Sequence, residues 1–215
     1  MEIRVALPSV KLGLVEADGV CLTSPHVALG QLLGDVCEQR RREFTLESLA
    51  EAEPTRAVRA MFRAWGVDPS KYRPSSEALL RRVVQGKGLY RVLDAVDIAN
   101  LGSIETGWPF GCYDRSRIHW PIAFRAGEAG ETYEGIGKRT WHLAGRPVLA
   151  DPGGPFGSPI SDSTRSMIRE STHDILAVIY APSSAPTTVI DSALTRLRER
   201  LSQYTGAVAA RSAIC

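Results

Sequence analysis

Cysteine is scarce in this chain, and the few cysteines have no spacing that binds a metal. Cys21, Cys37, Cys112 and Cys215 lie far apart, and no Cys-x-x-Cys pair occurs. The histidines are equally dispersed and form no His-Glu-x-x-His pattern, which argues against a zinc hydrolase. We therefore expect no metal or other cofactor. Unpatterned thiols suit a reducing compartment, so a cytoplasmic location is expected.

Long apolar runs and a strong charge of either sign are also missing. No run approaches the eighteen or so apolar residues that span a membrane, so we expect no membrane partner. The net charge of +2 is too weak to indicate nucleic acid by itself and does not exclude it. With 215 residues, 44% of them hydrophobic and 23% charged, the sequence predicts one folded domain over 1–215.

Apolar residues recur at helical spacing in five segments. Helices are expected at 27–43, 54–65, 75–85, 94–106 and 188–203. Pro54 is suited to the first turn of the second helix, and Gly66 and Gly107 are suited to the ends of the second and fourth.

Short strand patterns lie on either side of these helices. Strands are expected at 2–8, 11–17, 110–113, 118–125, 132–136, 147–150 and 175–180. The first two suggest an edge hairpin or the start of a sheet, and the tail from Gly206 is expected to fray. Strands, helices, strands and a last helix follow in blocks, which favours an α+β fold over an alternating one.

Polar residues cluster on the fourth helix and just after it. Asp97, Asn100 and Ser103 are three residues apart, so they share one side of a helix, and the chain returns with Asp114. Such residues can form a pocket in which carboxylates hold an ammonium group and an amide orients a carbonyl. Alternatively, Asp97 caps or salt-bridges, and Asn100 fixes a neighbouring loop.

A second candidate is the loop 151–163, followed by Arg165. Glycine and proline are frequent in it, which is typical of a shaped loop whose backbone N–H groups approach a ligand and stabilise an oxyanion. It is neither a phosphate-binding P-loop nor a dinucleotide fingerprint. A plain surface loop is the alternative.

Arginine and lysine concentrate in the first half of the chain. The cationic positions are Arg40, Arg41, Arg42, Lys71, Arg73, Arg81, Arg82, Lys87 and Arg91. They could contact phosphates. Solvated helix faces are the alternative, and glutamates between 38 and 53 weaken a polybasic interpretation.

The segment 95–118 resembles the B3/B4 domain of the bacterial phenylalanyl-tRNA synthetase beta subunit and the free-standing proteins built on it. The similar fragments are Ala95-Val-Asp-Ile-Ala-Asn100, Ile104-Glu-Thr-Gly-Trp-Pro109 and Tyr113-Asp-Arg-Ser-Arg-Ile118. Gly130-Glu-Thr132, Val148-Leu-Ala-Asp151 and Gly153-Gly-Pro-Phe-Gly157 follow in the family's order. The resemblance covers about 88–165, and helices at 54–85 look like those of free-standing members. We take 54–182 as the best-supported part, with a C-terminal helix and tail over 183–215.

The resemblance implies a single α+β domain with a β-sandwich-like core flanked by helices. It also implies a pocket between helix and sheet. In the synthetase this pocket edits by hydrolysing the ester of mischarged tyrosyl-tRNA. A water, the terminal RNA hydroxyl and backbone donors suffice for that chemistry. The chain has no catalytic module of a tRNA ligase, so we do not expect it to aminoacylate tRNA.

This sequence departs from the family at the editing site. The synthetase reads Pro-Met-His-Ala-Phe-Asp where this chain has Pro109-Phe-Gly-Cys-Tyr-Asp114, so Gly111 replaces the histidine. Ala99 replaces a threonine, and Pro159 stands where an ungapped comparison places the glutamate that senses tyrosine. Asp97 and Asn100 are retained. Tyrosine specificity is therefore not expected.

Two functions follow from this comparison. The first is an editing-like hydrolase that binds the acceptor end of a mischarged tRNA. Asp97 and Asn100 would shape its pocket, Gly157, Ser158 and Ser161 would face the ester, and Asp114 and Arg165 would position the loop or terminal adenosine. The alternative is a non-catalytic protein whose pocket binds a free amino acid or small metabolite. A scaffold with a vestigial pocket is a third interpretation.

Overall fold

The computed structural model describes residues 3–137 and 139–215. The helices are α1 Val27–Glu43, α2 Leu46–Glu51, α3 Glu53–Ala64, α4 Ser75–Val84, α5 Asp94–Thr106 and α6 Thr187–Thr205, with a 3-10 helix at Arg115–Arg117. The strands are β1 Ile3–Val5, β2 Val10–Asp18, β3 Phe110–Asp114, β4 Ile122–Ala126, β5 Thr132–Gly135, β6 Arg139–His142, β7 Pro147–Asp151, β8 Gly154–Gly157, β9 Ile175–Pro182 and β10 Ala209–Ile214.

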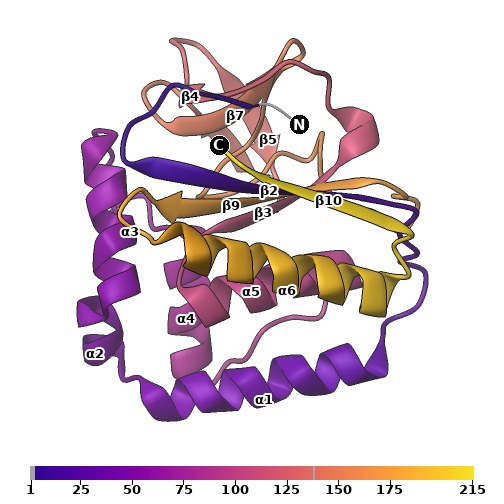
Figure 1. Cartoon of the computed structure of the whole chain (residues 1–215). Coiled ribbons are helices and arrows are strands. Elements are labelled where there is room, and N and C mark those ends of the chain that lie inside the picture. Colours follow the sequence, from indigo (N-terminus) through magenta and orange to yellow (C-terminus); the bar gives the residue numbers. More distant parts are fainter. Residues whose placement is uncertain (1–2, 138) are drawn as a thin grey trace.

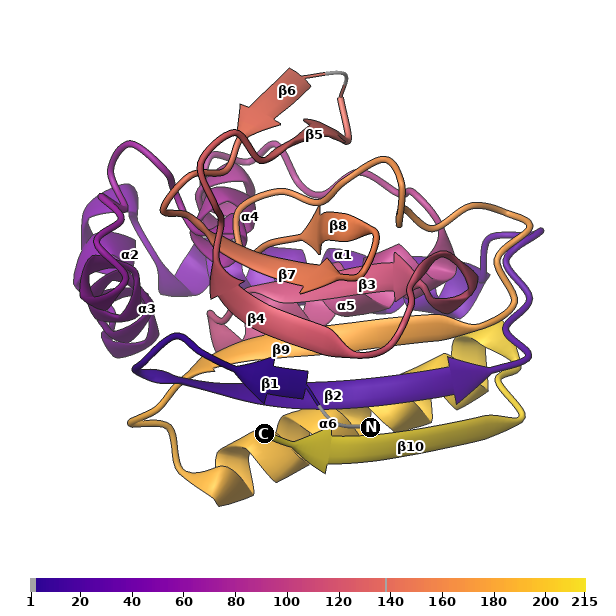
Figure 2. The same ribbon diagram turned by 90° about the horizontal axis from the view of Figure 1, so that it is seen from above.

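Two sheets lie face to face, with helices on the outer face of one of them. The sheet with the longer strands has the order β10-β2-β9-β3 and is antiparallel throughout. We call it the larger sheet, because β2 and β9 are the longest strands. The second sheet has the order β1-β4-β7-β8, and a hairpin of β5 and β6 stands apart. Helices α5 and α6 cover the free face of the larger sheet, and α1 lies beneath them (Figure 1). Figure 2 shows the second sheet across the opposite face.

The core lies on both faces of β9, and this explains the composition of the strand. Every residue of β9 is buried, because helices pack on one face and the second sheet on the other. A strand buried on both faces is a continuous apolar run rather than an alternating one. Ile179 faces α6 beside Gly13, while Tyr180 on the other face packs against Phe124 of β4.

The expected α+β sandwich flanked by helices is confirmed. All five predicted helices form within two residues of their expected ends. The sequence prediction missed α2, which is only six residues long. Its local signal is a capping box, in which Thr45 and Ser48 exchange side-chain and backbone hydrogen bonds.

Two expectations were wrong, and one of two alternatives was excluded. For the first two strands, the hairpin does not form and the start of a sheet does, because β1 pairs parallel with β4 while β2 lies inside the larger sheet. The tail does not fray, because β10 adds to the edge of β2 through six residue pairs. The strand expected at 118–125 begins only at Ile122, after the 3-10 helix. Within the described residues, no helix has the length and apolarity needed to cross a membrane.

Candidate functional site

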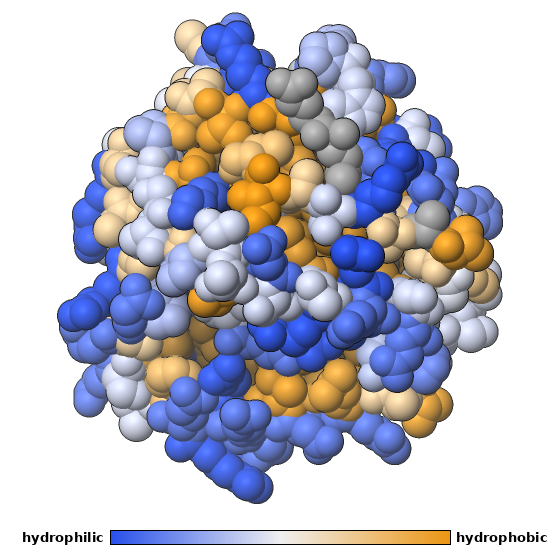
Figure 3. All heavy atoms as spheres, in the orientation of Figure 1, coloured by the Kyte–Doolittle hydropathy of each residue, from blue (hydrophilic) through white to orange (hydrophobic). Residues whose placement is uncertain are grey.

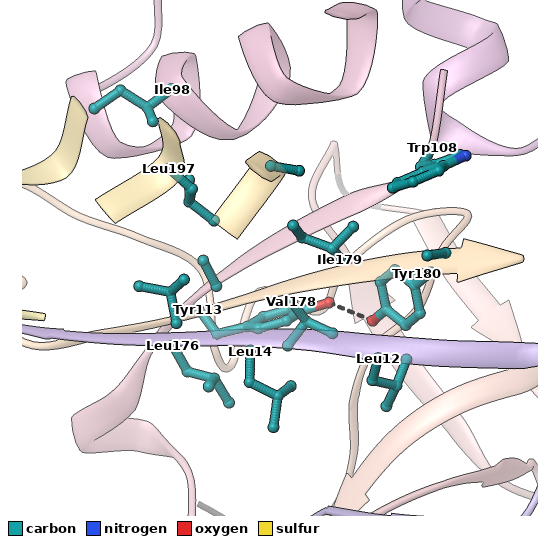
Figure 4. Packing of buried hydrophobic residues seen from close by; sticks show 14 of the residues in the cluster. Leu12, Leu14, Ile98, Trp108, Tyr113, Leu176, Val178, Ile179, Tyr180 and Leu197 are labelled. Atoms are coloured by element: carbon teal, nitrogen blue, oxygen red, sulfur yellow. Dashed lines mark hydrogen bonds between the residues drawn. The ribbon is translucent and has the colours of Figure 1, made fainter. Parts of the chain in front are cut away.

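A buried tyrosine connects the larger sheet to the glycine-rich loop. The hydroxyl of Tyr113 on β3 donates to Oδ1 of Asp162 in the loop, at 2.8 Å. The hydroxyl of Tyr180 on β9 lies 2.9 Å from that of Tyr113, and the two point toward each other between the sheets (Figure 4). Because Tyr113 gives its only proton to Asp162, Tyr180 is the donor to Tyr113. None of the residues Asp162, Tyr113 and Tyr180 is among the site residues predicted from the sequence.

The loop from Ser158 to Asp162 folds around its own hydrogen bonds. Ser158 Oγ accepts from the N–H groups of Ile160 and Ser161 and donates to the Ser161 carbonyl at 2.7 Å. The Ser158 N–H donates to Asp162 Oδ1 at 3.1 Å, and the Tyr133 hydroxyl also reaches the Ser161 carbonyl. The Ser158 hydroxyl therefore stabilises the loop through three internal hydrogen bonds, and its expected role toward an ester stays a prediction.

Tyr113 also explains why residue 111 is a glycine. A Cβ added at Gly111 would stand 2.1 Å from the Tyr113 hydroxyl oxygen, and one at Gly157 would stand 2.4 Å from its ring. Real Cβ atoms do not approach other atoms so closely. The tyrosine hydroxyl thus occupies the space that a side chain at 111 would need, and the family's histidine does not fit beside it.

Burial changes the acidity of the site. It raises the pKa of the Asp162 carboxyl from 3.8 to about 7, although the Ser158 N–H and the Tyr113 hydroxyl favour the charged form. Burial also raises the pKa of Tyr113 well above 10, and the neighbouring Asp162 charge adds to this. The pKa of Cys112 is raised to about 12, mainly by burial. Near neutral pH, Asp162 is the group here that gains or loses a proton.

An ion pair supports the other end of the loop. The guanidinium of Arg165 donates to both oxygens of Asp151, at 2.9 and 3.1 Å, and to the Gly154 carbonyl. Burial alone would raise the pKa of Asp151, but the Arg165 hydrogen bonds and the His119 N–H outweigh it, so this pKa is lowered. Arg165 therefore positions the β7–β8 turn, one of the two roles expected for it.

Asp97 is part of a second ion pair, away from the loop. Its carboxylate accepts from Nε of Arg91 at 2.6 Å and from the Val92 N–H at 3.0 Å. Arg91 also donates to Asp94, which accepts from the His26 N–H in front of α1. The salt-bridging alternative for Asp97 therefore describes its contacts, which fix the segment before α5.

Asp114 is fully hydrogen-bonded at the end of β3. Its Oδ1 caps the 3-10 helix by accepting from the Ser116 N–H at 3.0 Å, and its Oδ2 accepts from the Thr172 hydroxyl at 2.8 Å. Its own N–H donates to the Ser166 carbonyl at 2.9 Å. Asp114 thus holds β3 beside the segment that follows the loop, and both of its carboxylate oxygens are used in that structural role.

Asn100 and Ser103 share one side of α5, where Ser103 is buried and Asn100 half-buried. Gly102, between them in sequence, faces the Phe110 ring of β3. Within the described part of the chain, the Asn100 amide makes no hydrogen bond, and no contact brings it to the loop 158–163.

The sequence-predicted residues thus separate into groups. Gly157, Ser158 and Ser161 meet β3 through Tyr113 and Asp162, whereas Asp97 belongs to a different ion-pair group. The loop also contacts α4, because the Ser75 N–H donates to the Pro159 carbonyl at 2.9 Å. The local signal for Tyr113 was its alternation with Gly111 on one face of β3. No local pattern distinguished Asp162.

Other features of the surface lie elsewhere. A groove of about 320 Å³ lies between the start of α3, the end of α5 and the start of α6, and one of about 160 Å³ lies beside α2. Neither is lined by Asn100 or by the loop 158–163. In the described ranges, no three His, Cys, Asp or Glu side chains are grouped as metal ligands.

Comparison with known proteins identifies the family. The sequence model of the B3/4 domain matches residues 57–211, so the chain belongs to the B3/4 domain family. It is similar to a phenylalanine–tRNA ligase beta subunit from Streptomyces avermitilis, 39% identical over 95 residues. That match covers 43% of this chain and 11% of the relative. A solved N-terminal fragment of the phenylalanyl-tRNA synthetase beta subunit from Pyrococcus horikoshii matches with a TM-score of 0.44 and 14% identity. The match covers 100% of this chain and 50% of that one.

Proposed function

We propose that this chain binds the acceptor end of tRNA and hydrolyses the ester of a mischarged amino acid, with Asp162 as general base. Membership of the B3/4 family and the similarity to a tRNA ligase subunit support the tRNA partner. The observation that carries the hydrolytic step is the half-buried Asp162, held by Tyr113 and Ser158 with a pKa of about 7. A general base works best when its pKa is near the working pH.

The chemistry needs no covalent enzyme intermediate. Asp162 Oδ1 is occupied by the Tyr113 hydroxyl and the Ser158 N–H, so Oδ2 is the oxygen that takes a proton from water. The water oxygen attacks the ester carbonyl carbon, and the bond between that carbon and the ribose oxygen breaks. Asp162 returns the proton to the ribose oxygen, which leaves a free amino acid and an uncharged tRNA. Asp162 thus performs the proton transfer, because residue 111 is a glycine and no histidine is present there.

The remaining residues of the proposed site hold the loop in position. The backbone of 153–157 forms the turn and strand that precede the loop, and the Gly153 N–H donates to Asp151 Oδ1. Arg165 and Asp151 hold this backbone in place.

A second candidate is a pocket that binds a free amino acid without turnover. It is favoured by the internal use of the Ser158 hydroxyl, which engages that side chain within the loop. A thermal-shift screen against free amino acids and nucleosides detects this function, because a ligand that binds only the native state raises Tm.

The test is single-turnover hydrolysis of a panel of mischarged tRNAs at saturating protein. We expect at least one to lose its amino acid faster than the spontaneous rate, and Asp162→Asn to slow that reaction by about 10²–10⁴. The control is Asp191→Asn, an exposed aspartate on α6, which leaves the rate unchanged. Spontaneous rates for every tRNA reject the hydrolase.

A further inference from the structure

Cationic side chains and one exposed aromatic ring gather at the C-terminal end of α4. Arg81 and Arg82 lie in its last turn, and Lys87 and Tyr90 follow in the next segment. Arg41 of α1 lies beside them, since a Cβ added to Gly86 would stand 3.6 Å from its guanidinium. The α4 basic surface consists of Arg41, Arg81, Arg82, Lys87 and Tyr90. Hydrophilic side chains also gather over the neighbouring α1, at the lower edge of Figure 3.

These charges are largely unneutralised by the protein itself. Within the described ranges, Arg81, Arg82 and Lys87 form no ion pair, and Arg41 has only a long contact of 3.4 Å to Glu38, both side chains more than half exposed. Arg91, a few residues further, instead binds two buried aspartates. The net charge of the whole chain is only +2, so the excess here is local.

The half-buried Arg82 stacks on the exposed ring of Tyr90, and this pair is called the platform. The guanidinium carbon of Arg82 lies 3.8 Å from the centre of the Tyr90 ring, and the tyrosine is 69% exposed. Arg82 Nε is buried and has no hydrogen-bond partner among the described residues. An arginine in the last turn of a helix is favourable through the helix dipole alone. The helix dipole does not explain why the exposed ring of Tyr90 packs against Arg82.

Helix α4 links this platform to the candidate site. The first residue of α4 donates its N–H to the Pro159 carbonyl of the loop, and its last turn carries the arginines. The helix has ten residues and is therefore about 15 Å long. It stands between the sheet and α1 in Figure 1. A stacked strand with about 3.4 Å per nucleotide covers that distance with about four nucleotides.

From this arrangement we infer that the α4 basic surface binds the single-stranded 3′ end of the tRNA whose ester lies at Asp162. The phosphates contact Arg41, Arg81 and Lys87, and a base stacks on Tyr90 beside Arg82. Base stacking on aromatic rings together with arginine and lysine on the backbone is how proteins hold single strands without reading their sequence. The inference rests on the proposed function, and it assigns the tRNA contact to residues outside the catalytic group.

The test measures binding of uncharged tRNA to the full chain by fluorescence anisotropy at several salt concentrations. For Arg81→Gln/Lys87→Gln we expect at least tenfold weaker binding and a salt slope reduced by about two, since each lost phosphate contact removes roughly one. Tyr90→Ala weakens binding severalfold and leaves the slope unchanged. The matched control is Arg63→Gln, an arginine in the last turn of α3, which binds as the wild type does.

The outcomes distinguish a failure of the inference about the α4 basic surface from a failure of the proposed function. Thermal melting confirms that each variant is folded before binding is measured. Wild-type affinity and slope in Arg81→Gln/Lys87→Gln overturn the inference and leave the proposed function standing. No tRNA binding by the wild type overturns both. A tenfold loss that Arg63→Gln also shows reflects general charge, and it overturns the assignment to this surface.

Discussion

The Tyr113 hydroxyl donates to Asp162 Oδ1 at 2.8 Å, across 49 positions of sequence. This contact joins β3 of the larger sheet to the loop that follows β8. Asp162, Tyr113 and Tyr180 thereby form a row of consecutive hydrogen bonds. Asp162 is held by two donors yet remains half-buried. It is therefore both oriented and available near neutral pH.

Tyr113→Phe should raise the pKa of Asp162 further. The hydroxyl favours the charged carboxylate by hydrogen bonding to it, so its removal leaves burial less opposed. We expect the carboxyl resonance of Asp162, followed by NMR, to titrate near 7 in the wild type and at a higher pH in the variant. A midpoint that stays in place, or falls, contradicts the role given to Tyr113.

Asp162 should make the protein less stable as the pH rises from about 4 to about 7. Its pKa is about 7 in the folded chain and 3.8 ordinarily, so over this range the native state binds more protons than the unfolded state. Asp162→Asn has no carboxyl to ionise in the folded state. The Tm of the variant minus the Tm of the wild type should therefore increase from pH 4 to pH 8. A difference that is independent of pH across that range is evidence against the shifted carboxyl.

Gly157→Ala should destabilise the fold by about 1–3 kcal/mol, as overpacking does. Its new Cβ would meet the ring of Tyr113 at 2.4 Å, where the buried ring has no room to move. Gly34→Ala in α1 is the matched control, because a Cβ there meets nothing within 4 Å. It should stabilise the helix by about 0.5–1 kcal/mol. Denaturant unfolding measures both changes, and equal effects would show that Tyr113 is not tightly packed.

Asp151→Ala should cost about 2 kcal/mol of stability, less than the 3–5 of a fully buried pair. Asp151 is fully buried, but Arg165 is 31% exposed, so water screens part of the lost interaction. The comparison is Glu38→Ala, which breaks an exposed pair with Arg41 and should change stability by less than about 0.5 kcal/mol. A similar small loss in both variants, measured by denaturant unfolding, would mean that Arg165 does not support the loop.

Most of the fold follows from local patterns in the sequence. Apolar spacing located α1, α3, α4 and α6, because each buries a stripe of residues, and it also located α5, which is buried over most of its surface. Pairing between distant segments could not be read in the same way. Nothing in residues 3–5 specifies β4 as their partner, and β10 is ordered only because β2 leaves an edge for it.

The candidate site shows the same division. The loop and β3 were recognised from glycine content and family resemblance, but their contact depends on the side chains of Tyr113 and Asp162, which meet only in the folded chain. Asp97 and Asp114 were reasonable candidates by residue type. Their carboxylates are used by Arg91 and by Ser116 and Thr172, partners that helical spacing does not indicate.

The most direct measurement is the rate of hydrolysis of the best mischarged tRNA between pH 5.5 and 8.5, in the wild type and in Asp162→Asn. After subtraction of the spontaneous rate, the wild-type rate should rise with a midpoint near 7, the pKa of Asp162, while the variant stays near zero throughout. A variant that retains the wild-type rate and pH dependence would contradict the assignment of Asp162 as the general base.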